Sequence, residues 1–368
     1  MKKYLSRVVL ALWLSFLIFP FKGLRASLIL FAALAASFPL LNLLADFLKK
    51  VRIPAAPYTR FLPRDERYLS LLLIPVAALP FFAHDYVLDV AIISGIYIVL
   101  ALGLNVVVGY TGLLNLGFVA FYAIGAYSYA LLNTRLGIGF WSALPLSVLL
   151  TSAAGFLLAV PALRLRGDYL AIVTLGFGEI VRLVLNNWDS FTKGPNGISG
   201  IEPPYFFGTP ISRLSYYYYL VLAFVLLAVF VMGRVQDSKT GRAWISIRED
   251  EIASAAMGIH TTLYKLYACA FGAFWAGLAG CLFAAKMRFV SPESFTFMES
   301  VLILCMVIIG GIGSISGVIA GAILLVFLPE VLRDAQMYRM LVLGCALVFL
   351  MIFRPQGLFG RKSVSIGG

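Results

Sequence analysis

Charged side chains are scarce in this sequence. Asp, Glu, Lys and Arg make up 12% of its 368 residues, whereas 61% are hydrophobic. A chain so poor in charge cannot remain dissolved as a water-soluble domain. Apolar runs long enough to cross a bilayer core of about 30 Å recur along it, and they are continuous rather than alternating, which favours helices over a β-barrel. We predict an all-α fold, a polytopic transmembrane helical bundle of about 9–12 membrane segments, some broken or re-entrant.

Histidine and paired cysteines are scarce too. The chain has two isolated histidines, His84 and His260, so no metal site is expected. Its cysteines lie inside apolar runs without paired spacing, at Cys269, Cys281, Cys305 and Cys345. No nucleophile has a matching base, so we assign no catalytic residues and do not expect an enzyme. Nothing fits G-x-x-x-x-G-K-[ST], so we expect no cofactor in this chain and any ATP on a partner.

The net charge of +12 does not indicate a nucleic-acid partner. The basic residues cluster in loops between apolar runs, as the positive-inside rule expects for a chain in a lipid bilayer. Such clusters occur near both termini, at 48–68 and at 234–262, whereas the loop at 187–213 has no basic excess. The pattern predicts that both termini and the loop at 234–262 are cytoplasmic.

The apolar runs set the expected organisation of the chain. They lie at roughly 5–21, 27–47, 69–83, 86–108, 112–134, 140–163, 168–186, 214–233, 263–286, 298–313, 317–332 and 338–353. We predict an N-terminal extension at 1–84, with extra transmembrane helices and a basic cytoplasmic loop. A transmembrane domain at 85–360 and a cytoplasmic tail at 361–368 follow.

Glycines interrupt the run at 103–127, GLNVVVGYTGLLNLGFVAFYAIGAY. A broken helix at membrane depth is tolerated where it lines a cavity or is buried in protein, and such breaks aim half-helix ends at a substrate path. Close helix packing through small residues is the alternative. The residues we assign to a translocation path are Asn105, Gly109, Tyr110, Thr111, Gly112 and Asn115, with Thr174, Phe177 and Glu179 from a later run.

A second glycine-rich run, IIGGIGSISGVIAGA, occupies 308–322. Its spacing and its apolar flanks do not match a dinucleotide fingerprint. Gly313, Gly317 and Gly321 recur at every fourth position, which gives a helix a small-residue face. A break at 310–316 would instead match the first break, as in an internally repeated transporter. We assign helix-break or packing roles to Gly310, Gly311, Gly313 and Gly317.

Two opposite charges lie within the run at 168–186. Glu179 and Arg182 are three residues apart, so they share a helix face and can pair. An ionisable pair in a span usually faces protein or water. The pair is either a polar element of the translocation path or a structural pair near the helix end.

The loop GRAWISIREDEIASAAMGIH at 241–260 is polar, although long apolar runs flank it. It predicts a helix at about 249–260 whose acidic first turn suits the helix dipole. Such a helix either docks in a groove of a partner or lies on the lipid surface, which would favour a basic polar face. The acidic start favours docking. The residues that would couple this chain to a docked partner are Arg248, Glu249, Asp250, Glu251, Ala253, Ala256 and Gly258.

These segments resemble one family, the permeases of branched-chain amino-acid ABC importers of the LivM type. The resemblance runs over about residues 85–360, and the polar loop is similar to the EAA loop of ABC permeases, although it reads EIASAAMG. The resemblance rests on the sequence segments GLNVVVGYTGLLNLG, LRGDYLAIVTLGFGEIVR, GPNGIS, GRAWISIREDEIASAAMGI, FVSPESFTFMES, IIGGIGSISGVIAGAILL and FRPQGL.

The resemblance implies an importer of leucine, isoleucine and valine in the bacterial inner membrane. Its implied partners are a second permease of the LivH type, two cytoplasmic ATP-binding subunits and a periplasmic amino-acid-binding protein. Two alternatives stay open. One is an ABC permease for urea or amides. The other is a stand-alone ion-coupled transporter or channel, for which Asp89, Glu179 and Arg182 are the charged candidates.

Overall fold

A computed structural model describes residues 77–80, 84–162, 168–206, 209–211, 213–331 and 344. In chain order its helices are α3 (Asp85–Leu104), η2 (Asn105–Tyr110), α4 (Phe118–Leu136), α5 (Phe140–Ala162), α6 (Asp168–Asn187), α7 (Asp189–Thr192), η3 (Gly194–Asn196), α8 (Leu214–Asp237), α9 (Lys239–Glu249), α10 (Glu251–Ala256), α11 (Thr261–Met287), η4 (Pro292–Ser294), α12 (Phe297–Gly310) and α13 (Ile315–Val331). The predicted runs at 5–21, 27–47 and 338–353, most of 69–83, and the tail at 361–368 lie outside the described residues.

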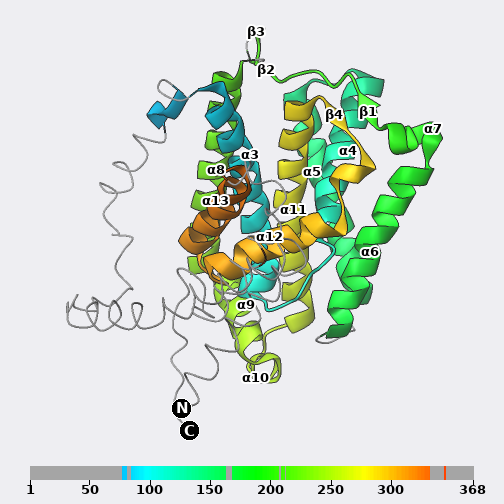
Figure 1. The fold of residues 1–368 in the computed structure, drawn as a ribbon. Helices are drawn as coiled ribbons and strands as arrows, with labels where there is room; N and C mark the ends of the chain where they lie inside the picture. The colour runs from blue at the N-terminus through cyan, green and yellow to red at the C-terminus, as the bar shows by residue number, and fades with distance from the viewer. Residues whose placement is uncertain are drawn as a thin grey trace, which may run out of the picture. The chain divides into compact units, whose positions relative to one another are not determined.

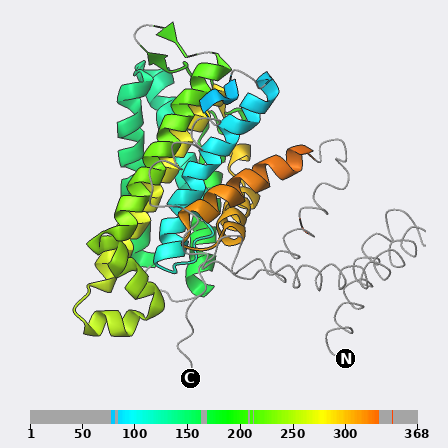
Figure 2. The same cartoon turned by 90° about the vertical axis from the view of Figure 1, so that its left-hand side faces the viewer.

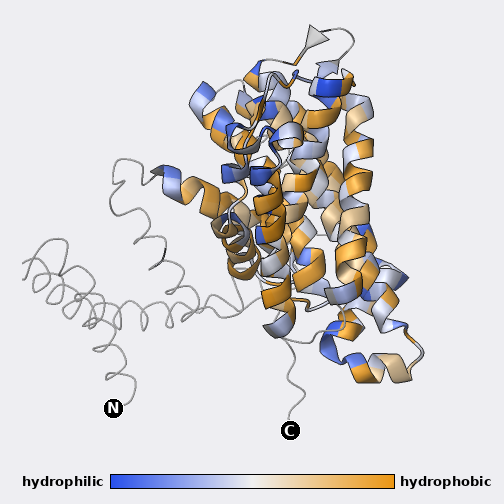
Figure 3. Ribbon diagram, turned by 90° about the vertical axis from the view of Figure 1, so that its right-hand side faces the viewer, coloured by the Kyte–Doolittle hydropathy of each residue, from blue (hydrophilic) through white to orange (hydrophobic). Residues whose placement is uncertain are grey.

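Six of the described helical segments are long and apolar enough to cross a membrane. They are Asp85–Tyr110, Phe140–Pro161, Tyr169–Asn187, Leu214–Asp237, Thr261–Met287 and Pro292–Gly310, and α13 is a shorter apolar helix. Hydrophobic residues predominate along the middle of the long helices (Figure 3). This confirms the predicted class, an all-α polytopic membrane bundle.

Two predicted boundaries were wrong because glycines end helices there. The run at 112–134 does not begin as a helix: Gly112 has a φ of +72°, and α4 starts only at Phe118. The run at 298–313 ends as a helix at Gly310, because Gly311 and Gly313 have φ values of +117° and +84°. These are left-handed conformations that glycine adopts without a steric penalty.

Helix α11 lies inside the bundle, packed against α3, α4 and α5 (Figure 1). Of its most apolar window, 78% is buried. Small residues allow this: a Cβ on Gly272 would lie 3.0 Å from the Gly103 carbonyl, and one on Gly277 would lie 2.7 Å from Thr151. The helix therefore carries glycine where the backbones and side chains of its neighbours approach it most closely.

Helices α12 and α13 form a hairpin against α3. Gly310 of α12 and Gly317 of α13 face each other so closely that a Cβ on either would overlap the other backbone. Figure 2 shows α13 lying obliquely to α3. The small-residue face predicted for 313–321 is correct for Gly317 and Gly321 only, because Gly313 belongs to the turn before α13.

The two ends of the bundle differ. One end carries two short antiparallel sheets: β1 (Ile198–Ser199) pairs with β4 (Phe289–Val290), and β2 (Tyr205–Phe206) pairs with β3 (Thr209–Pro210). Helices α9 and α10 project from the opposite end (Figure 2). The loops predicted at 187–213 and 234–262 therefore lie at opposite ends, as their charge patterns indicated.

The close packing of α4 against α11 can be tested at Gly125. A Cβ there would lie 2.5 Å from Gly277, so Gly125→Ala should force the helices apart at a cost of about 1–3 kcal/mol. We expect a lower midpoint of thermal unfolding in detergent. Gly176→Ala on α6 is the matched control, because a Cβ there meets nothing within 4 Å. Equal midpoints for the two variants would contradict the packing.

Candidate functional site

The two glycine-rich breaks lie against each other. Helix α3 continues into the π-helix η2, which ends at Tyr110. The Asn105 side-chain oxygen in η2 accepts a hydrogen bond from the Gly313 backbone N–H, at 2.9 Å. A Cβ on Gly109 would lie 2.8 Å from the Gly313 nitrogen and would also overlap the Asn105 side chain. Residues 208 positions apart thus form one polar junction.

Arg248 reaches this junction from α9. Its Nη1 donates a hydrogen bond to the Gly109 carbonyl at 2.6 Å. Added Cβ atoms on Gly112 and on Gly313 would each lie 3.2 Å from Arg248 side-chain atoms. The guanidinium of Arg248, one of the predicted coupling residues, is thus bonded to the bundle.

Two further predicted path residues make hydrogen bonds at the end of α3–η2. Tyr110 is buried and its hydroxyl donates to Gln236 Oε1 at 3.4 Å. Thr111 donates to the Val107 carbonyl at 2.6 Å, within its own helix end. Both side chains help to close the end of α3–η2.

Asn115 and Thr174 come together at a second place. Asn115 Oδ1 accepts from the Gly117 N–H at 3.0 Å, and Thr174 Oγ1 accepts from the Leu116 N–H at 3.1 Å. Both side chains line a small, mostly apolar cavity with room for about one water molecule. The cavity is too small for an amino acid. The Thr174 hydroxyl holds the 111–117 segment against α6, whereas the Asn115 bond lies within that segment.

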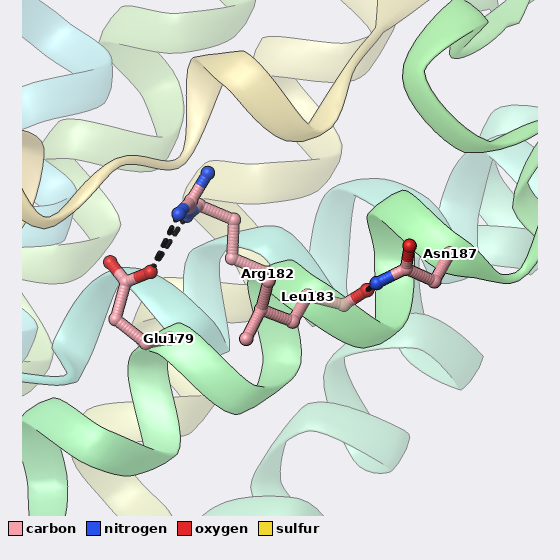
Figure 4. A network of polar contacts seen from close by, with 4 residues as sticks. All are labelled: Glu179, Arg182, Leu183 and Asn187. Carbon is pink, nitrogen blue, oxygen red and sulfur yellow. Dashed lines mark hydrogen bonds and ion pairs between the residues drawn. The ribbon is translucent and has the colours of Figure 1, made fainter.

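Helix α6 carries the remaining predicted path residues. The Phe177 ring packs 5.9 Å from that of Phe121 on α4. Arg182 donates twice to one oxygen of Glu179, at 2.7 and 2.9 Å (Figure 4). Only 22% of the most apolar window of α6 is buried, and both members of the ion pair are about one-third exposed. An ion pair there favours protein or water rather than lipid as the neighbour of this face.

The predicted helix at 249–260 is not a single helix. Helix α9 ends at Glu249, and Asp250 is extended, with a φ of −154°. The Asp250 carboxylate accepts hydrogen bonds from the N–H groups of Ile252 and Ala253, at 2.8 and 2.9 Å. Asp250 is therefore the N-cap of the short helix α10, and Glu249 belongs to the end of the preceding helix.

Helix α10 presents apolar side chains to the outside. Ile252 is 75% exposed and Met257, directly after the helix, is 83% exposed. Ala253, Ala256 and Gly258 are also exposed. Glu251 instead forms an ion pair with Lys265 of α11, at 2.6 Å.

Tyr97 and Glu299 form a half-buried polar pair that is not among the predicted site residues. The Tyr97 hydroxyl of α3 donates to Glu299 Oε1 of α12 at 3.0 Å, and Glu299 Oε2 is buried without a hydrogen bond. An acidic residue at the start of an apolar run was the available signal. Asp89, a candidate for ion coupling, pairs with Lys286 of α11 at 2.9 Å.

The apolar spans, the paired helix breaks and the projecting α9–α10 segment define a polytopic membrane protein of the transport permease class. Residues 86–351 match the family model described as branched-chain amino acid transport system / permease component, and the chain belongs to this family. It is a transport subunit, not an enzyme.

Two relatives are named high-affinity branched-chain amino acid transport system permease protein LivM, from Escherichia coli (strain K12) and Salmonella typhimurium. Each is 49% identical over 318 residues, which cover 80% of this chain and 75% of the relative. LivH of E. coli (strain K12) is 24% identical over 290 residues, which cover 73% of this chain and 92% of LivH. No solved structure matches the chain.

The cap at Asp250 gives a local prediction. Asp250→Ala removes the acceptor for two N–H groups, so α10 should lose about 1 kcal/mol of local stability. We expect the amides of Ile252 and Ala253 to exchange with deuterium about fivefold faster. Glu249→Ala is the control, since this exposed residue ends α9 and does not cap α10. Unchanged exchange after Asp250→Ala would show that the cap does not hold the helix.

Proposed function

We propose that this chain is the membrane-spanning permease subunit of a binding-protein-dependent ABC importer for leucine, isoleucine and valine. A second permease of the LivH type completes the translocation path. Two cytoplasmic subunits bind and hydrolyse ATP, and a periplasmic protein delivers the amino acid. The similarity to the branched-chain amino acid permeases LivM and LivH supports the substrate class and the second permease.

The observation that carries the energy coupling is the surface of α10. Two exposed apolar side chains, Ile252 and Met257, project from a short acid-capped helix at the end of the bundle. A helix of this kind seats in a protein groove through its apolar side chains. A lipid-bound helix would favour a basic polar face, whereas α10 begins with Asp250 and Glu251.

The exposed side of α6 supports a translocation path that this chain shares with a second permease. Helix α6 carries the Glu179–Arg182 pair, and it is the least buried of the six described segments that are long enough to cross a membrane. Contact with a second permease, or with water between two permeases, satisfies these charges better than lipid does. Asn105, Gly109 and Gly112 remain path candidates, because the break at η2 changes shape more easily than an unbroken helix.

The orientation follows from charge. The basic clusters at the ends of the chain and in the loop at 234–262 favour the cytoplasmic side of the inner membrane for both termini and for α9–α10. That side is where ATP is available. A stand-alone ion-coupled transporter is less well supported, because Asp89, Glu179 and Arg182 are all engaged in ion pairs.

Purification from native membranes in a gentle detergent, followed by mass spectrometry, tests the assembly. We expect two ATPase subunits and a second permease in the complex. A homo-oligomer without an ATPase would contradict the importer and favour a stand-alone transporter. With the complex in liposomes, isoleucine and valine should compete with leucine uptake, and competition by urea instead would favour the urea permease.

The docking surface has a sharper test. Ile252→Asp combined with Met257→Asp places two charges on the apolar side of α10, so the ATPases should be lost while the second permease stays bound. Leu136→Asp is the control, because Leu136 is 66% exposed at the end of α4 and is not part of α10. Full recovery of the ATPases with the double variant would rule out α10 as the docking helix.

A further inference from the structure

Arg248 occupies the position of a helix C-terminal cap. The end of a helix leaves carbonyl groups without intrahelical donors, and its dipole favours a cation there. The Arg248 guanidinium donates to one such carbonyl, that of Gly109, at 2.6 Å. The capping side chain comes from α9, and Arg248 is 139 residues from Gly109 in the sequence.

The backbone around Arg248 is shaped to admit its side chain. Gly112 and Gly313 both have positive φ values, of +72° and +84°. A Cβ on Gly112 would lie 3.2 Å from Arg248 Cγ, and one on Gly313 would lie 3.2 Å from Arg248 Nη1. One side chain thus contacts both helix breaks, which the Asn105–Gly313 hydrogen bond already joins.

Helices α9 and α10 are joined by side-chain bonds. The hydroxyls of Ser246 and Ser254 lie 2.7 Å apart, and Ser254 also donates to the Asp250 carbonyl at 2.7 Å. Trp244 of α9 donates to the Tyr264 carbonyl of α11 at 2.7 Å. We therefore expect a displacement of α10 to move α9 as well. Arg248 lies two residues before the Asp250 cap, so it would move with them.

We propose that Arg248 is a positioning residue that transmits the movement of α10 to the two helix breaks. With Arg248 in place, the end of η2 is capped and held against the 311–314 turn. When α9 shifts, the Gly109 carbonyl loses its donor and the end of η2 is free to rearrange. This inference rests on the proposed function, because α10 moves only if an ATPase pulls on it.

The first test measures coupling in the complete importer in liposomes. Arg248→Ala should leave the ATPases bound and ATP hydrolysis in place, but lower leucine uptake per ATP at least tenfold. Arg248→Lys, which keeps the positive charge and a donor, should recover part of the ratio. Arg242→Ala is the control: Arg242 is exposed on the same helix, and its guanidinium donates to the Asp237 carbonyl rather than to a helix break. Uptake per ATP within twofold of wild type in Arg248→Ala would overturn the proposal.

Loss of the ATPases from Arg248→Ala would overturn it too, since Arg248 would then be a direct docking contact. If the wild-type chain itself purifies without ATPases, the proposed function fails rather than this inference alone. A structural measurement distinguishes a positioning role of Arg248 from a direct docking contact without relying on transport.

That readout is hydrogen–deuterium exchange in the complex, with and without a non-hydrolysable ATP analogue. In wild type, exchange should change both at 250–257 and at 105–113. In Arg248→Ala the change at 250–257 should persist while the change at 105–113 disappears. Persistence of both changes would show that the movement bypasses Arg248.

Discussion

The hydrogen bond between Asn105 and Gly313 holds together the two broken helices on which the functional end of this bundle depends. In a bilayer, every backbone group freed by a helix break must find its partner inside the protein. Here the Asn105 side chain accepts from the Gly313 N–H, and the Arg248 guanidinium donates to the Gly109 carbonyl. The breaks are tolerated because one side chain of the first break satisfies the second, and Arg248 of α9 satisfies the first.

That junction requires close backbone approach, and the small residues of the bundle provide it. Gly109 has no side chain because a Cβ there would overlap Asn105, and Gly310 has none because α13 passes beside it. The same rule governs α11, which could not lie between α3, α4 and α5 with large side chains at Gly272 or Gly277. Packing through small residues thus places the breaks in the interior.

Much of the fold could be predicted because apolar runs report bilayer spans directly. The run at 140–163 is found as Phe140–Ala162, and the run at 168–186 as Asp168–Asn187. Pairings between distant residues could not be predicted. Asn105 meets Gly313 across 208 positions, and Tyr97 meets Glu299 across 202. Neither pair leaves a periodic signal in the sequence.

The polar loop shows a different limit. Its three consecutive acidic residues, at 249–251, all suit a helix start, so the pattern could not show which of them is the cap. The structure assigns that role to Asp250, which divides the loop into two helices. The division matters for Arg248, because it places this residue at the end of α9, facing the bundle, rather than at the start of a docking helix.

A single hydrogen bond to a charged group sets a scale for what Arg248 can contribute. Such bonds are worth about 1.5–3 kcal/mol, which corresponds to a bias of roughly 10- to 150-fold between two states. Complete switching of a two-state protein needs about 5.5 kcal/mol. Arg248 can therefore direct where a movement of α9 is felt, but the free energy for the full change must come from the ATPases. An exposed arginine suits that task, because water can solvate the guanidinium as soon as it leaves the Gly109 carbonyl.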